Sequence, residues 1–443
     1  MENEGRKKKH LIFGGCDTTA LAEKYGTPLY VMDEQRIRSK CKEIREVFLA
    51  KHENTRAVYA SKAFLNMTMC KIIESEGIGL DVVSGGELFT AIQAGFPTAD
   101  IIFHGNNKSY EELTLAVKYD VGRIVVDNVY ELEMLQKIAK SNKKKTKILF
   151  RIAPGIEGST HKYISTGQKD SKFGIPLAEE QLNHVVSFAL KASHLELMGF
   201  HFHLGSQLFE NGIYIAALEV LAKLMKDMKE RYGFVSKELN VGGGFGIFYV
   251  EGDQPKPLEY FTDQIMDKVK ELCQEIGVLI PKVIIEPGRW MVAEAGVTLY
   301  TIGAIKDIPG VRTYVSVDGG LPDNPRPALY SAKYQGDIAN KMNLEKVQKV
   351  TIAGKCCETG DILIWDIMVP PVKSGDILAV YNTGAYNYSM ASNYNRLPRP
   401  PVVLVNEGSD HMIVRRETYE DLLHREEIPM YLQRKAKESI EMI

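Results

Sequence analysis

The residue most suited to covalent chemistry in this sequence is Lys62. It follows the apolar, strand-like run 57–60, and its neighbours Ser61, Ala63 and Phe64 are small or apolar. An ammonium group at the end of a buried strand loses hydration, which lowers its pKa and frees the amine to attack a carbonyl. The alternative is that Lys62 marks a strand end and extends its charge to solvent, as most lysines do. The elements around Lys62 must decide between these interpretations.

Strand-like apolar runs alternate with helical patterns along the first two thirds of the chain. The runs span residues 57–60, 79–83, 101–103, 123–126, 148–152, 198–204, 238–241 and 283–285. The helical patterns lie at 64–76, 86–94, 109–118, 129–140, 179–192, 212–232 and 258–276. This alternation predicts parallel strands joined by right-handed crossovers, and eight units match an α/β fold of the TIM type, a (β/α)8 barrel. The alternative is an open doubly wound sheet, but no early G-x-G-x-x-G loop supports it.

The pattern changes after residue 296, where helical periodicity becomes rare and short strands follow one another. They lie at 297–305, 313–317, 349–353, 362–369, 377–380, 401–405 and 411–415. Such a series is typical of an antiparallel β domain, which the early strand near residue 30 would join. Asp33 would then cap a helix that runs to about residue 48. We therefore expect a barrel domain at 36–296 and a second, mostly antiparallel β domain made of 1–35 and 297–443.

Polar or ionisable residues, or glycines, are found at the carboxyl end of each of the eight barrel strands. Because barrel enzymes place their chemistry at the carboxyl ends of the strands, residues in this phase predict one shared pocket. They are Lys62, Asp81, His104, Asp127, Arg151, His203 with Ser206, the glycines 242–244, and Glu286 with Arg289.

Three of these groups suggest particular chemistry. The glycine triplet 242–244 would close its backbone N–H groups on an anion, or form only a tight turn. His203 would lie flat on an aromatic ligand, or pair with His201 as a core histidine on the same face of one strand. A metal site would need a third ligand that no nearby spacing supplies. Glu286 would hold a protonated ring nitrogen while Arg289 clamps an anion, unless the two simply form an internal salt bridge.

Composition narrows the choice of partner and compartment. The chain has 443 residues, 44% of them hydrophobic, and 55 basic against 57 acidic residues, which argues against nucleic acid or an anionic membrane as partner. No apolar stretch reaches membrane-span length, and no signal-peptide core is present. The six cysteines form no metal-type C-x-x-C pair, so we expect a cytoplasmic protein without a metal.

Taken together, the motifs resemble the fold-type III pyridoxal-phosphate decarboxylases over nearly the whole chain, from about residue 11 to 425. The residues that carry the resemblance are Ala60-Ser61-Lys62-Ala63, His203-Leu204-Gly205-Ser206, the glycine triplet, Glu286-Pro287-Gly288-Arg289, and Cys357-Glu358 followed by Asp361. Two further stretches, His161-Lys162-Tyr163-Ile164 and Ser171-Lys172-Phe173-Gly174, are similar to the branch of this family that acts on diaminopimelate. Thr359 stands where serine is usual, and it keeps the hydroxyl.

The resemblance implies pyridoxal 5'-phosphate as cofactor and assigns residues to it. Lys62 would bind it covalently, His203 would stack on its ring and Glu286 would pair with the pyridine nitrogen. The other residues expected to contact the cofactor are Asp81, Ser206, Gly243, Gly244, Gly288, Arg289 and Tyr386.

The resemblance also implies a small amino-acid substrate, meso-2,6-diaminopimelate, converted to L-lysine and CO2. Its distal end would be held by Arg289, Arg326, Tyr330, Glu358 and Tyr386. Cys357 would supply a proton and, with Glu358, would come from the partner chain of a homodimer. The alternatives are a decarboxylase for ornithine, lysine or carboxynorspermidine, a non-catalytic relative, and an amino-acid racemase.

Overall fold

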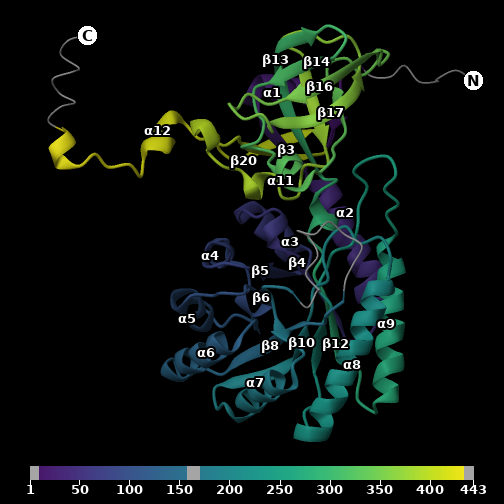
Figure 1. The fold of residues 1–443 in the computed structure, drawn as a ribbon, viewed down its shortest axis with the longest axis vertical. Helices are drawn as coiled ribbons and strands as arrows, with labels where there is room; N and C mark the ends of the chain where they lie inside the picture. The colour runs from purple at the N-terminus through teal and green to yellow at the C-terminus, as the bar shows by residue number, and fades with distance from the viewer. Residues whose placement is uncertain (1–8, 157–169, 434–443) are drawn as a thin grey trace, which may run out of the picture.

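The computed structural model describes residues 9–156 and 170–433 as two stacked units, a barrel and a β domain (Figure 1). The barrel strands pair in parallel in the order β10-β11-β12-β4-β5-β6-β7-β8, and β10 also pairs with β8, which closes the barrel. The strands are β4 Thr55–Ala60, β5 Gly79–Val82, β6 Ile101–Phe103, β7 Arg123–Val126, β8 Thr146–Ala153, β10 Leu195–His201, β11 Glu238–Asn240 and β12 Lys282–Ile285. The predicted eight-stranded barrel is confirmed.

Helices surround the barrel where the sequence predicted them. They are α2 Glu34–Ile44, α3 Met67–Ser75, α4 Gly85–Gln93, α5 Tyr110–Lys118, α6 Val129–Ser141, α7 Glu179–Lys191, α8 Gly212–Tyr232 and α9 Leu258–Glu275. The side chains of Asn66, Ser84, Ser109 and Asn128 accept hydrogen bonds from the first turns of α3 to α6. These caps satisfy backbone donors that would otherwise lack partners, and they keep the loops above the strands short. None of the helices in the described ranges is long and apolar enough to span a membrane.

The prediction for β10 is wrong at its end. The strand stops at His201, so His203 lies in the loop that follows rather than on the same strand face. Phe202 and Leu204 are nevertheless fully buried, which explains why this loop has the apolar alternation of a strand.

The β domain is a single mixed sheet that is mostly antiparallel. Its order is β17-β16-β14-β13-β3-β19-β20, with β18 pairing β13 and β15, and only the pairs β14–β16 and β3–β19 are parallel. The early strand β3 joins this sheet, as predicted, and lies between β13 and β19. The strands are β3 Leu29–Asp33, β13 Gly296–Ile308, β14 Arg312–Val317, β15 Gly336–Ile338, β16 Gln348–Ala353, β17 Ile362–Val369, β18 Ile377–Tyr381, β19 Val402–Asn406 and β20 Ser409–Val414.

Short elements complete the described chain, and most of them carried no strong periodic signal. The hairpin strands β1 Ile12–Phe13 and β2 Cys16–Asp17 precede α1 Thr18–Tyr25, and β9 Ile175–Pro176 pairs with β8. The short helices are α10 Arg289–Val292, α11 Arg326–Tyr330 and α12 Tyr419–Leu423. Helix α11 lies between two of the predicted strands, and Pro327 is suited to the first turn of a helix.

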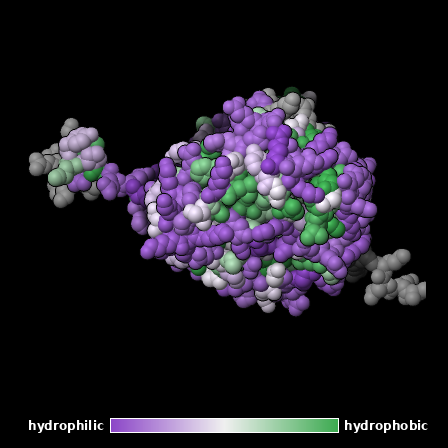
Figure 2. Space-filling model, turned by 90° about the horizontal axis from the view of Figure 1, so that it is seen from below, coloured by the Kyte–Doolittle hydropathy of each residue, from purple (hydrophilic) through white to green (hydrophobic). Residues whose placement is uncertain are grey.

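The floor of the barrel is closed by apolar side chains, so the pocket opens only at the carboxyl ends of the strands. Six inward-facing residues from six strands form one buried cluster: Val58, Ile102, Val125, Leu149, Met198 and Ile284. The opposite face of the barrel, turned away from the β domain, is largely hydrophilic with a few apolar patches (Figure 2). The packed interior therefore supports the strand ends as a rigid platform.

One aspartate joins the two units of the chain. Asp33 is the last residue of β3, and its carboxylate accepts hydrogen bonds from the N–H groups of Gln35 and Arg36 in α2, at 2.9 and 3.3 Å. We predict that Asp33→Ala lowers the free energy of unfolding by about 1–2 kcal/mol, the usual cost of a lost N-cap. Urea titration measures it. Asp33→Asn keeps the acceptor and is the control, so an equal loss in both variants would contradict the capping role.

Candidate active site

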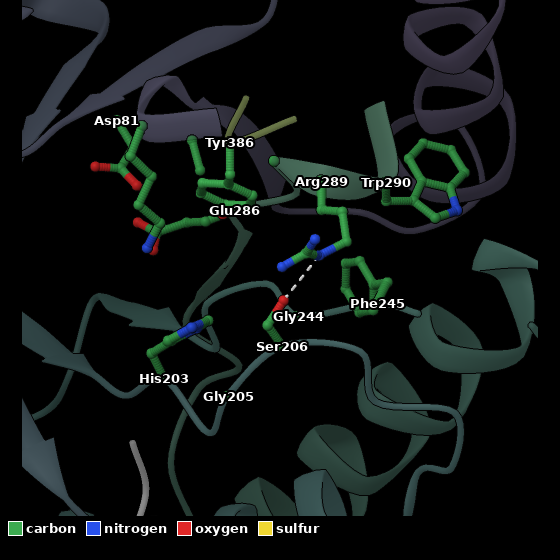
Figure 3. A pocket seen from close by; sticks show the side chains of 13 residues that line it. Asp81, His203, Gly205, Ser206, Gly244, Phe245, Glu286, Arg289, Trp290 and Tyr386 are labelled. Carbon is green, nitrogen blue, oxygen red and sulfur yellow. Dashed lines mark hydrogen bonds between the residues drawn. The ribbon is translucent and has the colours of Figure 1, made fainter. Parts of the chain in front are cut away.

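Lys62 lies in a pocket of about 500 Å³ at the carboxyl ends of the barrel strands, facing the β domain. It is the middle residue of a one-turn 3-10 helix, Ser61–Ala63, that directly follows β4. The pocket and a smaller recess that adjoins it (Figure 3) bring together most of the residues expected from the sequence. These are Lys62, Asp81, His203, Ser206, Gly244, Glu286, Gly288, Arg289, Arg326, Tyr330 and Tyr386.

The β domain contacts the barrel next to this lysine. The N–H of Tyr386 donates to the carbonyl oxygen of Ala63 at 2.8 Å, and the hydroxyl of Ser389 donates to the same oxygen at 2.8 Å. Tyr386 has a φ of 63°, a left-handed conformation that costs a residue with a side chain on the order of 1–3 kcal/mol. The surrounding contacts hold this conformation, and they place the Tyr386 ring in the pocket beside Arg289.

Glu286 is the most heavily bonded acid of the site. Its Oε1 accepts from Asn240 Nδ2 at 2.5 Å and lies 2.7 Å from His104 Nε2, while His201 Nε2 is 3.3 Å from Oε2. Burial would raise the pKa of this carboxyl, but the two histidines outweigh that effect and hold its pKa well below the usual value. Glu286 is therefore ionised at neutral pH, and its Oε2, which makes only the longer contact with His201, is the oxygen available to a cationic partner in the pocket.

In the neighbouring groups burial is the largest effect on the pKa. Burial raises the pKa of Asp81 to about 6, and its Oδ1 has no hydrogen-bond partner among the described residues. Burial lowers the pKa of His201 to about 3. Burial and the nearby Lys62 lower the pKa of His203 well below its ordinary value, so its ring is neutral at neutral pH. A neutral, planar imidazole is suited to packing against an aromatic ligand.

Ser206, Gly244, Gly288 and Arg289 form a small recess suited to an anion. Arg289 donates from Nε to the hydroxyl of Ser206 at 3.1 Å and from Nη1 to the hydroxyl of Tyr249 at 2.9 Å. A Cβ at Gly244 would lie 2.3 Å from the carbonyl oxygen of Gly205, so no side chain fits there. A hydroxyl, a guanidinium and closely packed glycines are the groups that bind a phosphate.

Gly243 has a different position from the one expected. It is absent from the pocket lining in the described structure, and a Cβ there would lie 2.0 Å from the carbonyl oxygen of Glu286. Its own carbonyl accepts from the hydroxyl of Tyr214 at 2.8 Å. Gly243 thus packs against the backbone that carries Glu286.

A second arginine lies at the wall formed by the β domain. Arg326, at the start of α11, is buried, and its Nε has no hydrogen-bond partner among the described residues. Its guanidinium carbon lies 5.4 Å from the centroid of the Tyr386 ring and 5.2 Å from that of Tyr330. A buried guanidinium with an unsatisfied donor is costly, which indicates that an anion binds at this wall.

Comparison with known proteins identifies the family. A family model described as the pyridoxal-binding domain of pyridoxal-dependent decarboxylases matches residues 34–293. The diaminopimelate decarboxylase of Bacillus subtilis is 51% identical, covering 94% of this chain and 94% of its own length, and that of Synechocystis is 45% identical, covering 96% and 91%. A solved structure of diaminopimelate decarboxylase from M. jannaschii in complex with L-lysine superposes with a TM-score of 0.88 at 34% identity, covering 96% of this chain and 98% of that one.

This chain belongs to the diaminopimelate decarboxylase family. The enzymes of this family are pyridoxal-dependent, and the described residues fit that cofactor. The pocket offers an amine, a phosphate-sized recess bordered by glycines, and an ionised carboxylate for a ring nitrogen. The predicted fold, family and cofactor are therefore confirmed.

Two residues expected from the diaminopimelate decarboxylase family lie outside this pocket. Cys357 and Glu358 are exposed in the loop between β16 and β17, and they are not among its lining residues. The loop is nevertheless fixed. The Asp361 carboxylate accepts from Cys356 N at 2.8 Å and from Leu321 N at 2.7 Å, and Asn395 Oδ1 accepts from Cys357 N at 2.9 Å.

Of the two further stretches that carry the resemblance, 161–164 and 171–174, the structure describes only the second. His161-Lys162-Tyr163-Ile164 lies outside the described residues, whereas Lys172 and Phe173 line the pocket. The guanidinium of Arg151 packs 4.3 Å from the centroid of the Phe173 ring, and Gly174 N donates to Asp127 Oδ2 at 3.0 Å. Arg151, within β8, and Asp127, directly after β7, thus anchor this segment to the barrel.

Sequence reasoning missed the partners of Glu286. His104 was expected at a strand end but had no role, and Asn240 was not singled out at all. Their only signal was position: His104 directly follows β6, and Asn240 ends β11 just before the glycine triplet. His104 and Asn240 are 182 and 46 residues away from Glu286 in the sequence. Only the closed barrel brings them next to it.

We predict that Asp361→Ala loosens the loop that carries Cys357, because it removes two hydrogen bonds from backbone amides to an ionisable carboxylate. The loss should lower the free energy of unfolding by about 2–3 kcal/mol and speed amide hydrogen exchange across residues 354–361. Exchange followed by mass spectrometry measures this. Glu345→Ala, at an exposed acid of the same domain, is the control. Unchanged exchange in the Asp361 variant would show that the carboxylate does not hold the loop.

Proposed function

We propose that this chain uses pyridoxal 5'-phosphate to decarboxylate meso-2,6-diaminopimelate to L-lysine and CO2. The observation that carries the proposal is the buried Arg326, which lines the same pocket as Lys62 and Arg289 and whose Nε has no hydrogen-bond partner among the described residues. Relatives with nearly the same length are named diaminopimelate decarboxylase, and a structural neighbour binds L-lysine. Both findings support the same substrate.

The chemistry of the substrate's distal end explains two arginines in one pocket. Diaminopimelate carries a carboxylate and an ammonium there, and a guanidinium binds a carboxylate through two parallel hydrogen bonds. Ornithine and lysine carry only an ammonium at that end, which Arg289 and Arg326 would repel. Tyr330, against which Arg326 packs, would limit the position of that carboxylate.

The residues around Lys62 are suited to bind and polarise the cofactor. When bound, the cofactor accepts the electron pair that departing CO2 leaves on the α-carbon. Lys62 would hold the cofactor through its amine, and His203 would pack on the ring. Ser206, Gly244 and the backbone of Gly288 and Arg289 would bind the phosphate. Glu286, kept ionised, would pair with the ring nitrogen and hold a proton there, while Asp81 and Tyr386 border the same space.

A proton must then reach the α-carbon, and we assign this step to Cys357 of a second copy. The sulfhydryl proton would move from Cys357 Sγ to the α-carbon, and Glu358 would bind the distal ammonium. Two observations support a shared site: the Cys357–Glu358 loop lies outside its own pocket, and it is held rigidly although it is exposed. Fixing an exposed loop in this way is useful when another surface must meet it.

The two domains of the chain would then have different roles. Residues 36–296 would bind the cofactor, and residues 1–35 with 297–443 would supply substrate contacts and the homodimer interface. We place the protein in the cytoplasm. The six cysteines are all free, as is usual in a reducing compartment.

Removing Arg326 tests directly whether the substrate carries a distal carboxylate. Arg326→Ala should lower kcat/KM for diaminopimelate by about 30- to 150-fold, equivalent to about 2–3 kcal/mol, because a charge-assisted bidentate contact is lost. Lysine formation measured by chromatography reports the rate. Arg425→Ala, in an exposed segment, is the control. An unchanged kcat/KM in the Arg326 variant would exclude this wall from substrate binding and with it the substrate assignment.

Mixed dimers test the shared site. Lys62→Ala and Cys357→Ala should each be nearly inactive alone, with cofactor absorbance kept in the cysteine variant. Mixed in equal amounts and allowed to exchange subunits, they should regain about a quarter of wild-type activity, because half of the dimers are hybrids with one intact site. No recovery, with hybrid dimers confirmed by native mass spectrometry, would place Cys357 and Lys62 in the same chain's site.

A further inference from the structure

Glu286 can stay ionised in its buried position only if neighbouring groups donate hydrogen bonds to it. It is almost completely buried, and burial alone raises the pKa of a carboxyl. Asp81, which borders the same pocket with fewer donors, shows the effect, since burial raises its pKa to about 6. The donors to Glu286 therefore decide whether this acid can pair with a protonated ring nitrogen.

Both histidines next to Glu286 lower its pKa, but of the two only His104 makes an aligned hydrogen bond to it. His104 Nε2 lies 2.7 Å from Oε1 in hydrogen-bonding geometry, and an ionised carboxylate can only accept, so Nε2 carries the hydrogen. His201 Nε2 is farther away, at 3.3 Å, and makes no aligned hydrogen bond. Because burial lowers its pKa to about 3, His201 contributes no positive charge at neutral pH.

His104 is itself fixed by both backbone and ring contacts. Its N–H donates to the carbonyl oxygen of Val82 at 2.7 Å, and its ring meets that of His201 edge-on, with centroids 4.7 Å apart. Asp81 Oδ1 lies 3.8 Å from Nε2. His104 thus stands between two buried carboxylates, and its ring nitrogen is closer to Glu286 than to Asp81.

The same cluster has the residue types of a metal site, but its spacing does not suit one. His104, His201 and Glu286 offer ligand atoms within 4.8 Å of one another. Two ligands of a tetrahedral zinc ion, each about 2.0–2.2 Å from the metal, lie roughly 3.3 Å apart. The nitrogen of His104 and the oxygen of Glu286 are only 2.7 Å apart, which is a direct hydrogen bond.

We propose that His104 is a positioning residue that keeps the Glu286 carboxylate ionised and aimed at the ring nitrogen of the cofactor. It acts through the hydrogen bond from Nε2, with Asn240 as the second donor on the same oxygen. This inference rests on the proposed pairing of Glu286 with the ring nitrogen. Because the acid and its histidine follow different barrel strands, closing the barrel is what brings them together.

The experiment measures the ring nitrogen itself in the holoenzyme. Enzyme loaded with pyridoxal phosphate labelled with ¹⁵N in the ring is studied by NMR, because the nitrogen chemical shift reports whether that atom carries a proton. His104→Leu removes the donor. His104→Gln keeps a donor at a similar reach. Glu286→Gln is the reference for a lost carboxylate, and His184→Leu on exposed α7 is the control.

We expect the ring nitrogen to be protonated in the wild type, in His104→Gln and in the control. In His104→Leu its shift should move towards that of Glu286→Gln, and kcat should fall about tenfold or more, the effect of roughly one pKa unit. If the leucine variant does not fold, His104→Asn, whose amide is too short to reach Glu286, takes its place.

The outcomes separate this inference from the proposal on which it rests. A protonated ring nitrogen in His104→Leu, or in its asparagine substitute, together with a changed shift in Glu286→Gln, would overturn the role of His104 alone. An unchanged shift in Glu286→Gln would overturn the pairing of Glu286 itself. A variant that only binds the cofactor less tightly, with its ring nitrogen still protonated, would show a structural role and also overturn the inference.

Discussion

The hydrogen bond from the amide of Tyr386 to the carbonyl oxygen of Ala63 is the contact on which the site depends. It joins the β domain to the turn that carries Lys62, and the hydroxyl of Ser389 strengthens it by donating to the same oxygen. The left-handed backbone of Tyr386 is stable only because this contact and its neighbours fix it. Neither unit alone has a complete pocket: the barrel supplies Lys62 and Glu286, and the β domain supplies Arg326 and closes the space above them (Figure 1).

Charge in this pocket is arranged in two zones, and each zone fits a different part of one bound molecule. Deep in the barrel, Glu286 is kept ionised by its donors while Asp81, with fewer donors, has a raised pKa. Near the β domain, Arg289 and Arg326 pack against the Tyr386 ring. Low local polarity makes each of these interactions strong, and it makes an unpartnered group costly. A cationic ring nitrogen in the first zone and an anionic group in the second therefore satisfy the site.

Much of the fold could be predicted from sequence because its signals are local. Periodicity located all eight barrel strands, and the strand-end rule placed Lys62, Asp81 and Glu286 in one pocket. The errors have equally local causes. Phe202 and Leu204 are buried in a loop and mimic a strand, and α11 is too short to show periodicity. What could not be predicted is pairing across the barrel, such as His104 and Asn240 on Glu286, since no spacing in the sequence records it.

Asp361 connects two loops that we assign to different active sites. Its carboxylate accepts from Leu321 in the loop leading to Arg326, and from Cys356 beside Cys357. A Cβ at Gly354 or Gly320 would lie 2.2 or 2.4 Å from Asp361 Oδ1, so both loops pack against this acid without side chains of their own there. Arg326 faces the chain's own pocket, whereas Cys357 would serve the partner's. Because packed elements shift together rather than independently, displacement of one loop by substrate would be felt by the other. If Cys357 serves a second copy, as proposed, Asp361 would be the contact that links the two sites of the dimer.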